Sequence, residues 1–364
     1  MKRRDFVKVT GLAAATAATI AAPAIAQSMP ELKWRMTASW PKSLDTLYGG
    51  AEIMAKAVAE VTDNKFQIQT FAAGEIVPGL QVLDAVQNGT VEMGHTASYY
   101  YFGKDPTFTF GTSLPFGPNM RLNQAWYMNG GGREVLNEFY KNYNVISLLA
   151  GNTGCQMGGW FRSEIKTLDD MKGLKFRCGG FAGLILQRLG IVPQQIAGGD
   201  IYPALEKGTI DACEWVGPYD DEKLGFNKIA KYYYYPGWWE GASVGSIYIN
   251  LDAWQKLPKQ YQTMVETAAG LVTSWMVPKY DAGNPIALRR LVASGTELRP
   301  FPRSVLEPCF AEAYKYYDEL SAKDPKFKKI YDSLKAFRGD QNLWFRVAEN
   351  TFDNFNFSMS AAGR

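Results

Sequence analysis

Two stretches of the chain carry nearly the same sequence, "ALEKGTIDACEW" at residues 204–215 and "AVQNGTVEMGHT" at residues 85–96. They align without gaps at an offset of 204 − 85 = 119 residues. Each copy is typical of the end of a helix, a glycine cap and the beginning of a strand. Gly89 and Gly208 lie where a left-handed cap conformation is needed, and glycine adopts this conformation without steric cost.

The offset of 119 residues is close to the length of a small domain, so the repeat predicts two lobes of related architecture. Chance similarity over a dozen residues is the alternative. In open α/β sheets the carboxyl ends of strands line the ligand crevice. The repeat therefore predicts that residues 95–98 and 214–217 lie on opposite walls of one cleft.

The rest of the chain alternates short apolar runs with amphipathic segments, which indicates an α/β fold. The sequence predicts strands at residues 31–40, 66–74, 144–152, 173–180 and 243–250. Apolar residues at helical spacing predict a helix at residues 45–62. A later helix is expected to begin at Pro258 and to be interrupted at Pro278. After Pro302 the chain is expected to be helical almost to its end.

The first 26 residues predict a Tat-type export signal. The twin-arginine sequence "RRDFVK" (3–8) precedes a weakly apolar stretch from Val9 to Ala26 that ends in "AIA". An uncleaved membrane anchor is the alternative, but the stretch is short and is broken by Gly11 and Pro23. Cleavage leaves 364 − 26 = 338 residues and removes four basic residues and one acid, so the net charge falls from +3 to zero. We therefore expect a periplasmic protein with two cores and no nucleic-acid partner.

The cysteines and aromatic residues narrow the class of protein. Aromatic residues make up 14% of the chain, which favours thick cores or an aromatic-lined cleft. The cysteines form no CxxC pair and are too few for a disulfide framework. They are Cys155, Cys178, Cys213 and Cys309. We expect buried thiols, although the sequence does not settle whether any pair is bonded.

Several longer segments carry a resemblance to a known family. They are "GEIVPGLQVLDAVQNGTVEMGH" (74–95), "IKTLDDMKGLKFRCGG" (165–180), "IYPALEKGTIDACEW" (201–215) and "INLDAWQKLPKQYQ" (249–262). Together they resemble the DctP-type solute-binding proteins of TRAP transporters, over nearly the whole mature chain. Three further segments resemble the branch that binds α-keto acids and related monocarboxylates with a metal ion: "CQMGGWF" (155–161), "CEWVGPYDD" (213–221) and "YYYYPGWWEGAS" (232–243).

The resemblance implies a bilobed type II periplasmic binding fold that closes over an organic anion and delivers it to a membrane permease. We expect an export signal at residues 1–26 and C-terminal helices at 304–364 that pack on the lobes or on a partner subunit, as in a homodimer. The first lobe is expected to comprise residues 27–150 and about 245–303, and the second lobe residues 151–244.

The resemblance also implies which residues bind the anion. Arg177, in "LKFR", is at the position of the carboxylate-binding arginine. A guanidinium offers two parallel N–H donors to a carboxylate that loses its hydration in a closed cleft. A surface arginine at a strand end is the alternative. Gln156 follows an apolar strand, so its amide could contact both the anion and a metal ion; an ordinary loop glutamine is the alternative.

Glu214 and Glu240 pose a question of charge, because an acidic side chain is costly to bury beside an anion. Two carboxylates and the carboxylate of the ligand sum to −3, and Arg177 supplies +1. A bound cation would offset most of the remainder, and hard cations take oxygen ligands. We expect it to be held by Glu214, Glu240, the Gln156 amide oxygen, the Trp215 carbonyl and the ligand, with Na⁺ favoured over Ca²⁺. The alternative is that either glutamate pairs with a Lys or Arg in a structural bridge.

Aromatic side chains are expected to close around the ligand, and Tyr100 and Phe181 are predicted to contact it. His95, the only histidine in the chain, is expected to be a hydrogen-bonded structural residue. Three cysteines each adjoin a predicted ligand residue, and side chains alternate along a strand. Cys155 precedes Gln156, Cys178 follows Arg177 and Cys213 precedes Glu214. We therefore expect these three thiols to point into the lobes.

These features predict an extracytoplasmic TRAP-transporter receptor for a small 2-oxo or 2-hydroxy monocarboxylate of the size of pyruvate, bound with a metal cation. An exported, Tat-dependent enzyme is the main rival. However, the sequence has no dinucleotide-binding glycine fingerprint, no cysteine cluster for an iron–sulfur centre and a single histidine. A sensor of the same fold that does not serve transport is a third alternative. The sequence does not determine the preferred acid, the cation, the affinity or the oligomeric state.

Overall fold

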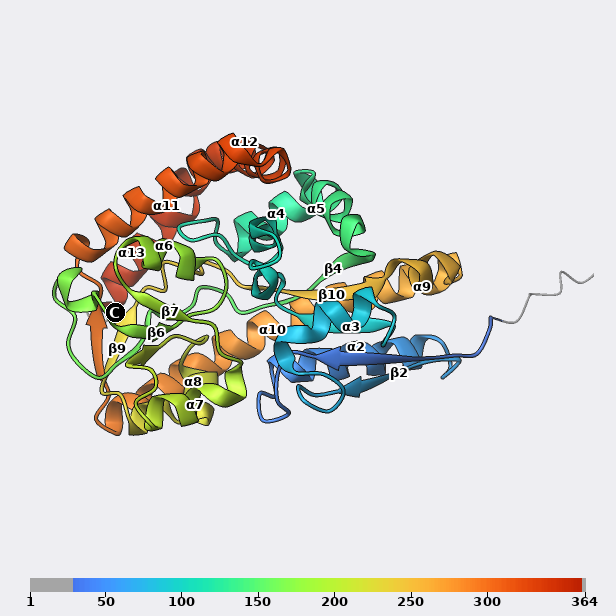
Figure 1. The fold of residues 1–364 in the computed structure, drawn as a ribbon, viewed down its shortest axis with the longest axis horizontal. Helices are drawn as coiled ribbons and strands as arrows, with labels where there is room; N and C mark the ends of the chain where they lie inside the picture. Colours follow the sequence, from blue (N-terminus) through green and yellow to red (C-terminus); the bar gives the residue numbers. More distant parts are fainter. Residues whose placement is uncertain (1–28, 362–364) are drawn as a thin grey trace, which may run out of the picture. The chain divides into compact units, whose positions relative to one another are not determined.

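The computed structural model describes residues 29–361, which form two β-sheets and the helices that surround them (Figure 1). The α/β fold class predicted from the sequence is confirmed. The predicted export signal at residues 1–26 lies outside the described residues. Within residues 29–361, no helix combines the length and the apolar character that a membrane crossing requires.

The first sheet has five strands in the order β2-β1-β3-β10-β4. Its strands are β1 (Leu32–Ala38), β2 (Phe66–Phe71), β3 (Met93–Thr96), β4 (Val145–Asn152) and β10 (Val244–Asn250). β10 runs antiparallel to β3 and β4, and β4 is buried along its whole length, as its apolar sequence predicts. We call this sheet and its helices the first lobe. The helices are α2 (Leu47–Val61), α3 (Val82–Gln87), α4 (Met120–Asn129), α5 (Gly132–Tyr140) and α9 (Leu251–Lys256).

The second sheet has six strands in the order β11-β9-β5-β8-β6-β7. They are β5 (Gly159–Phe161), β6 (Lys175–Arg177), β7 (Val192–Gln194), β8 (Ala212–Cys213), β9 (Tyr232–Tyr235) and β11 (Glu297–Pro300). We call this sheet the second lobe, together with α6 (Ala182–Arg188), α7 (Gly198–Glu206) and α8 (Pro218–Leu224). Short 3-10 turns lie at η1 (Gly79–Gln81), η2 (Ser98–Tyr101), η3 (Pro106–Gly111), η4 (Lys141–Tyr143), η5 (Asp169–Met171) and η6 (Phe226–Lys228).

The sequence repeat is also a structural repeat, with one copy in each lobe. Gly89 and Gly208 adopt the predicted left-handed conformation, with φ of +72° and +70°. The backbone N–H of the residue after each glycine donates a hydrogen bond to a carbonyl of the preceding helix. Thr90 N donates to the carbonyl of residue 85 at 2.8 Å, and Thr209 N donates to that of residue 204 at 2.9 Å. The strand begins three residues further on, at β3 and β8.

The acid that the two copies share at equivalent positions, Glu92 and Asp211, binds an equivalent partner in each lobe. Glu92 accepts from the backbone N–H of Arg35 at 2.7 Å, and Asp211 accepts from that of Lys175 at 2.8 Å. Arg35 lies in β1 and Lys175 in β6, and these strands pair in parallel with β3 and β8. Each copy therefore fastens the end of its helix to a neighbouring strand and brings the next strand to the same edge of its sheet.

The long helix α10 (Lys259–Ala293) connects the lobes (Figure 1). It contacts α2 and β4 of the first lobe and α8 of the second. The predicted interruption at Pro278 is wrong, because the helix continues through Pro278 and Pro285. A proline removes a backbone hydrogen bond from a helix. Buried side chains on both sides of Pro278, including Met276 and Tyr280, hold the helix against the lobes.

The chain crosses between the lobes once more than the sequence indicates. Residues 245–303 were expected in the first lobe, and β10 does lie there. β11, however, pairs with β9 in the second sheet. The continuous α10 carries the chain from one lobe to the other, so β11 begins where the second lobe is within reach.

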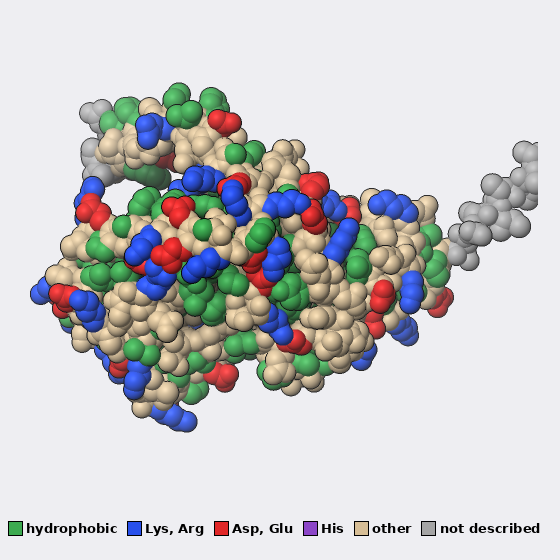
Figure 2. Space-filling model, turned by 45° about the horizontal axis from the view of Figure 1, so that its top comes forward, with side chains coloured by type: hydrophobic (Ala, Val, Ile, Leu, Met, Phe, Trp, Pro, Cys, Tyr) green, Lys and Arg blue, Asp and Glu red, His purple; other side chains and the backbone are tan. Residues whose placement is uncertain are grey.

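The chain after Pro302 is helical, as predicted, in α11 (Arg303–Lys323), α12 (Pro325–Val347) and α13 (Glu349–Ala361). α11 packs on α6 of the second lobe, and α12 packs on α4 and α5 of the first. α13 packs chiefly on α12. Figure 2 shows hydrophobic side chains gathered on the helical segment at the upper left of the view.

Candidate functional site

Arg177 and Glu214 form a buried ion pair where β6 and β8 end. β6 ends at Arg177, and the parallel strand β8 ends at Cys213, immediately before Glu214. Arg177 Nη1 lies 2.6 Å from Glu214 Oε1 and 2.8 Å from the Glu214 carbonyl oxygen. The two side chains are 2% and 1% exposed. The guanidinium also lies over the ring of Trp215, 4.9 Å from its centroid.

The protein anchors the Arg177 guanidinium through two of its three nitrogen atoms. Besides the bonds from Nη1, Nε donates to the carbonyl of Ile196 at 3.0 Å. Nη2 donates to none of the described residues. Because the guanidinium is planar and rigid, anchoring two nitrogens fixes the direction in which the third presents its N–H groups.

Gln156 and Glu240 reach the same region from separate segments. Gln156 N donates to the Glu240 carbonyl at 3.0 Å, and Gln156 Nε2 donates to Thr153 Oγ1 at 3.1 Å. Tyr99 OH, from the first lobe, donates to Glu240 Oε1 at 3.1 Å. The Tyr99 ring lies so close to Gly180 that a Cβ there would come within 1.9 Å of Tyr99 Cδ2. The absence of a side chain at Gly180 therefore allows the Tyr99 ring to pass over this residue and to bond to Glu240.

Three buried oxygen atoms in this region have no hydrogen-bond partner among the described residues: Gln156 Oε1, Glu214 Oε2 and Glu240 Oε2. Leaving such an atom unpaired costs roughly 1–3 kcal/mol, and more when it is charged. Burial raises the pKa of both glutamates, and the Glu214 charge raises the pKa of Glu240 further. Buried amide and carboxylate oxygens without partners fit a hard cation, which takes oxygen ligands.

The oxygen set differs from a site built on acids and histidines alone. No group of three or more His, Cys, Asp or Glu side chains that could hold a metal is found in residues 29–361. The predicted set has only two such side chains, Glu214 and Glu240. It would complete the coordination with the Gln156 amide, the Trp215 carbonyl and the ligand.

A small cavity of about 20 Å³ lies where the two lobes meet. The first lobe lines it with Trp40, Leu47, Ala97, Tyr99 and Tyr100, and the remaining lining is Thr153, Gln156, Trp215, Val216 and Ser243. Such a volume is of the order of one water molecule. A molecule larger than water therefore needs the lobes to separate before it can enter this space.

A larger cavity of about 610 Å³ lies on the same boundary between the lobes. Residues 78–81 of the first lobe and residues 195–197 of the second are part of its lining. Gln195 Nε2 donates to the Tyr100 carbonyl at 2.8 Å, so this hydrogen bond joins the wall of the larger cavity to the wall of the smaller one. The two cavities therefore adjoin at this contact.

Comparison with protein families decides what kind of protein has this site. Residues 37–324 match the DctP family model, described as "Bacterial extracellular solute-binding protein, family 7". The chain belongs to this family. It is a TRAP-transporter extracytoplasmic solute receptor, and receptors of this kind are periplasmic.

Individual relatives agree with this placement. The receptor is 49% identical to a "Monocarboxylate 2-oxoacid-binding periplasmic protein" from Nostoc sp., over 98% of this chain and 99% of that one. It is 51% identical to a TRAP solute-binding protein from Bordetella bronchiseptica, solved as a mixed-occupancy dimer with copurified calcium and picolinate. That structure covers 92% of this chain and 100% of its own, with a TM-score of 0.91. A protein from Pseudoalteromonas atlantica with bound sodium and pyruvate is 36% identical over 89% and 99% of the chains, with a TM-score of 0.86.

The receptor brings together most of the residues predicted from its sequence. Tyr100, Gln156 and Trp215 line the small cavity, and Glu240 is hydrogen-bonded to Tyr99 and Gln156, which also line it. Arg177 lies over the ring of Trp215 and pairs with Glu214. The alternative, a structural bridge, is also present, since Glu214 pairs with Arg177. It uses only Oε1 of Glu214, so the bridge and a cation contact through Oε2 are compatible.

The prediction for Phe181 is corrected. Its ring is fully buried against Tyr316, Tyr317 and Phe327 of the C-terminal helices. α11 covers α6, whose first residue follows Phe181 directly, so the ring is taken up in this packing. We no longer assign Phe181 to the ligand.

Sequence reasoning missed other residues of the site. Trp40, Thr153 and Ser243 line the small cavity, and Gly179 N donates to Glu214 Oε1 at 2.5 Å. Trp40 could have been found, because it ends a predicted strand and strand ends line the crevice in such folds. The contact of Gly179 depends on the pairing of β6 with β8, which no local pattern predicts.

The cysteines of the receptor follow the prediction at two of the three positions beside the site. Cys178 and Cys213 are buried, but Cys155 is exposed, so the prediction for Cys155 is wrong. It follows Gly154, whose φ is +70°, in a loop, where the alternation of side chains along a strand does not apply. All four cysteines lie within the described residues and are free thiols.

His95 is a structural residue in the first lobe, as its hydrogen bonding indicates. It is fully buried, its Nε2–H donates to the Ala150 carbonyl at 2.9 Å, and the ring of Trp40 packs edge-on at 4.9 Å. Burial lowers the pKa of His95 to about 4. Its Nδ1 is buried without a hydrogen-bond partner among the described residues.

We expect the stability of the receptor to fall between pH 6.5 and pH 4 because of His95. The unfolded chain binds a proton at its ordinary pKa, whereas the folded chain does so only near pH 4, so the stability present above pH 6.5 is lost as the pH falls. The shift corresponds to about 3 kcal/mol. Urea unfolding of the wild type and of His95→Gln at several pH values measures how much of the pH-dependent free energy of unfolding comes from His95. An NMR titration of the folded protein that gives a pKa near 6.5 would contradict the prediction.

Proposed function

We propose that the receptor binds a small 2-oxo monocarboxylate such as pyruvate together with a metal cation, and delivers it to the membrane permease of a TRAP transporter. The observation that carries this proposal is the set of three unpaired buried oxygens beside Arg177. The relatives support it, since one is named for 2-oxoacid binding and another holds pyruvate with sodium.

The residues divide into an anion side and a cation side. Arg177 Nη2 is directed by the anchored guanidinium and would donate to the ligand carboxylate. Gln156 Oε1, Glu214 Oε2, Glu240 Oε2 and the Trp215 carbonyl would hold the cation, with the ligand carboxylate and 2-oxo oxygens. Without a cation, the two glutamates, the arginine and the ligand sum to −2. We favour Na⁺, with Ca²⁺ as the alternative, and the solved relatives hold one or the other.

Ligand capture would proceed by separation and closure of the lobes. The small cavity has contributions from both lobes and has room for about one water molecule. Tyr99 and Tyr100 of the first lobe would approach the ligand only on closure. α10 contacts both lobes and is the element about which they would move.

We also infer that the chain is a receptor rather than an enzyme, and that it reaches the periplasm by the Tat pathway. The twin arginines in "RRDFVK" (3–8) support the Tat route. The match to a solute-binding family model supports a receptor. A sensor that uses the same fold without transport remains the second candidate. It would bind the same acid but would have no permease partner.

We further propose a homodimer formed through the C-terminal helices. The last described helix, α13, and the end of α12 expose large apolar side chains. These are Leu343, Trp344, Val347, Phe352, Phe355 and Phe357, each 59–71% exposed. A second copy of the chain is the occupant we favour, because the relative from Bordetella bronchiseptica was solved as a dimer.

A thermal-shift titration with pyruvate tests the function. In NaCl or CaCl₂, pyruvate at about 100 times its Kd should raise the Tm by roughly 5 °C through mass action. In choline chloride with a chelator the shift should be much smaller. Glu240→Gln keeps an acceptor for Tyr99 but removes a charge, and we expect its affinity for pyruvate with the cation to fall about tenfold. If no 2-oxo acid changes the Tm under any of these conditions, the proposal is wrong.

A further inference from the structure

The loop that carries Glu214 and Trp215 is held by a buried carboxylate, Asp221 of α8. Asp221 Oδ1 accepts from Val216 N at 3.2 Å and from Gly217 N at 3.1 Å. On the other side of the loop, Glu214 N donates to the Arg177 carbonyl at 3.0 Å. The peptide of Trp215 is thus fixed from both ends.

Asp221 is itself held by an aromatic pair in the second sheet. Its Oδ2 accepts from Trp160 Nε1 at 2.9 Å and from Tyr233 OH at 2.7 Å. Trp160, from β5, and Tyr233, from β9, are fully buried and stack with ring centroids 3.9 Å apart. Asp221 therefore accepts four hydrogen bonds, which occupy the acceptor sites of a carboxylate. Asp221 therefore connects the loop to two buried, stacked side chains of the sheet, and these fix the position of the loop.

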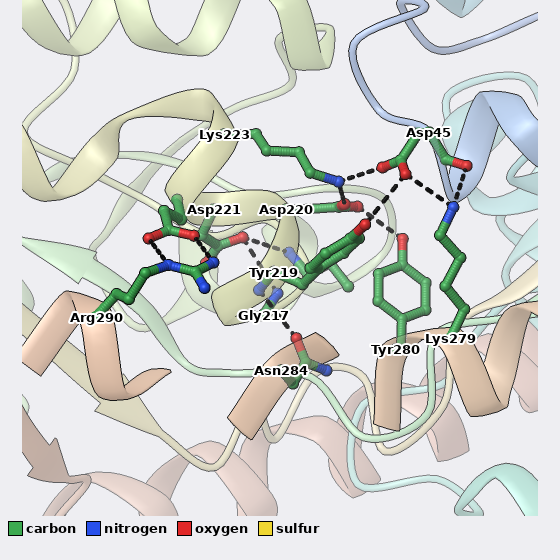
Figure 3. Close-up of polar contacts among 12 residues, drawn as sticks. Asp45, Gly217, Tyr219, Asp220, Asp221, Lys223, Lys279, Tyr280, Asn284 and Arg290 are labelled. Carbon is green, nitrogen blue, oxygen red and sulfur yellow. Dashed lines mark hydrogen bonds and ion pairs between the residues drawn. The ribbon is translucent and has the colours of Figure 1, made fainter. Parts of the chain in front are cut away.

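The outer side of α8 is tied to the first lobe by Asp45, which lies just before α2 (Figure 3). Asp45 Oδ1 accepts from Lys223 Nζ, and Asp45 Oδ2 accepts from Tyr219 OH at 3.1 Å. Lys279 of α10 lies 2.8 Å from Asp45 Oδ2 and donates to the Asp45 carbonyl at 2.8 Å. Partial burial acts to raise the pKa of Asp45, but the hydrogen bonds from the two lysines lower it to about 2.

α8 also rests on the helix that connects the lobes. Asp220 Oδ2 accepts from Tyr280 OH at 2.6 Å, and Tyr219 N donates to Asn284 Oδ1 at 3.0 Å (Figure 3). Tyr280 and Asn284 both belong to α10. The short helix α8 thus has three contacts. Asp221 bonds to the binding loop, and Asp220 bonds to the connecting helix α10. Lys223 and Tyr219 bond to Asp45 of the first lobe.

We propose that α8 couples closure of the lobes to the geometry of the cation loop, with Asp221 as the positioning residue and Asp45 as the contact that holds α8 in the closed arrangement. The inference rests on the proposed function. When Asp45 engages Lys223 and Tyr219, α8 is fixed against the first lobe, and Asp221 then keeps the Trp215 peptide and Glu214 in place. Separation of the lobes would release Asp45 first.

The expected effects differ between the two carboxylates. Asp221→Asn keeps Oδ1 as an acceptor for the loop but places an N–H₂ group against the Trp160 donor, so we expect pyruvate to bind about 10- to 50-fold more weakly. Asp45→Asn removes the ion pair with Lys223, which joins the first lobe to α8, and the pair with Lys279 of α10; the Asp45 side chain is about half exposed. We expect its dissociation rate for pyruvate to rise about 3- to 10-fold, with little change in the association rate.

The experiment measures the affinity for pyruvate in NaCl by calorimetry and the two rate constants by stopped-flow tryptophan fluorescence, on the mature chain. Glu222→Gln is the matched control. It breaks the pair with Arg290 on the same helix and the same α10, yet touches neither the loop nor the first lobe. Its affinity should stay within about twofold of the wild type.

Each outcome of this experiment either supports or overturns the coupling. If Asp221→Asn binds pyruvate like the wild type, or if Asp45→Asn leaves the dissociation rate unchanged, the inference is overturned while the proposed function stands. If the wild type binds no 2-oxo acid, it is the proposed function that fails. Should Asp221→Asn fail to fold, Tyr233→Phe removes one donor to Asp221 and should weaken binding about 3- to 10-fold. Unchanged affinity in that variant also overturns the inference.

Discussion

Replacement of Arg177 by alanine should weaken pyruvate binding by at least about 100-fold. Its guanidinium is the cationic group of the site, and truncating one member of a buried charge pair costs roughly 2–5 kcal/mol. Arg177→Lys keeps the charge but not the planar fork, so its affinity should fall between those of the alanine variant and the wild type. Calorimetry in NaCl provides the affinities.

Loss of Arg177 also leaves Glu214 buried without its cationic partner, so the Tm of the ligand-free protein should fall. Circular dichroism separates this effect from loss of binding. Arg188→Ala is a suitable control, because Arg188 also lies over an aromatic ring, that of Tyr316, and also pairs with glutamate, but does so at α11, away from the cavity. Affinity like that of the wild type in Arg177→Ala would show that the ligand carboxylate is bound elsewhere.

Replacement of Phe352, Phe355 and Phe357 by serine should convert the proposed dimer of the receptor to a monomer. These side chains are 65–70% exposed on α13, which packs chiefly on α12, so they contribute little to the core of one subunit. Burial of exposed aromatic surface is a main source of the free energy of association. Size-exclusion chromatography with light scattering measures the mass.

A second triple variant provides the control for the dimer. Leu271, Ile286 and Val292 are exposed apolar residues of α10, at 45–50%, and their replacement by serine should leave the mass unchanged. Pyruvate affinity should be preserved in both triple variants, because none of these positions lines either interlobe cavity. A wild type that is monomeric at micromolar concentration would refute the proposed dimer, as would a dimeric phenylalanine variant.

Much of the fold could be predicted because local physics sets it. The left-handed caps at Gly89 and Gly208 follow from the absence of a Cβ atom, and the apolar run of β4 follows from burial on both faces. Pro278 misled the prediction, because the cost of a proline within a helix is local while the packing that outweighs it involves both lobes.

The residue types of the site were also apparent from the sequence, since an acid among apolar residues needs a partner. Glu214 and Glu240 were therefore recognisable as candidates, and Arg177 and Gln156 came from the family resemblance. The ring of Phe181 could not be placed, because the helices that cover it follow more than a hundred residues later in the chain.

The sequence by itself determined the α/β class, the duplicated helix–glycine–strand unit and the kinds of side chain at the cleft, since these depend on neighbours along the chain. The tertiary structure alone decided which atoms are left without partners. Arg177 meets Glu214 across 37 residues and Tyr99 meets Glu240 across 141. Only these long-range contacts use one oxygen of each glutamate and leave the other unpaired. The physical reason is that hydrogen bonding within a closed cleft depends on how strands and lobes pack, and no local pattern encodes that packing.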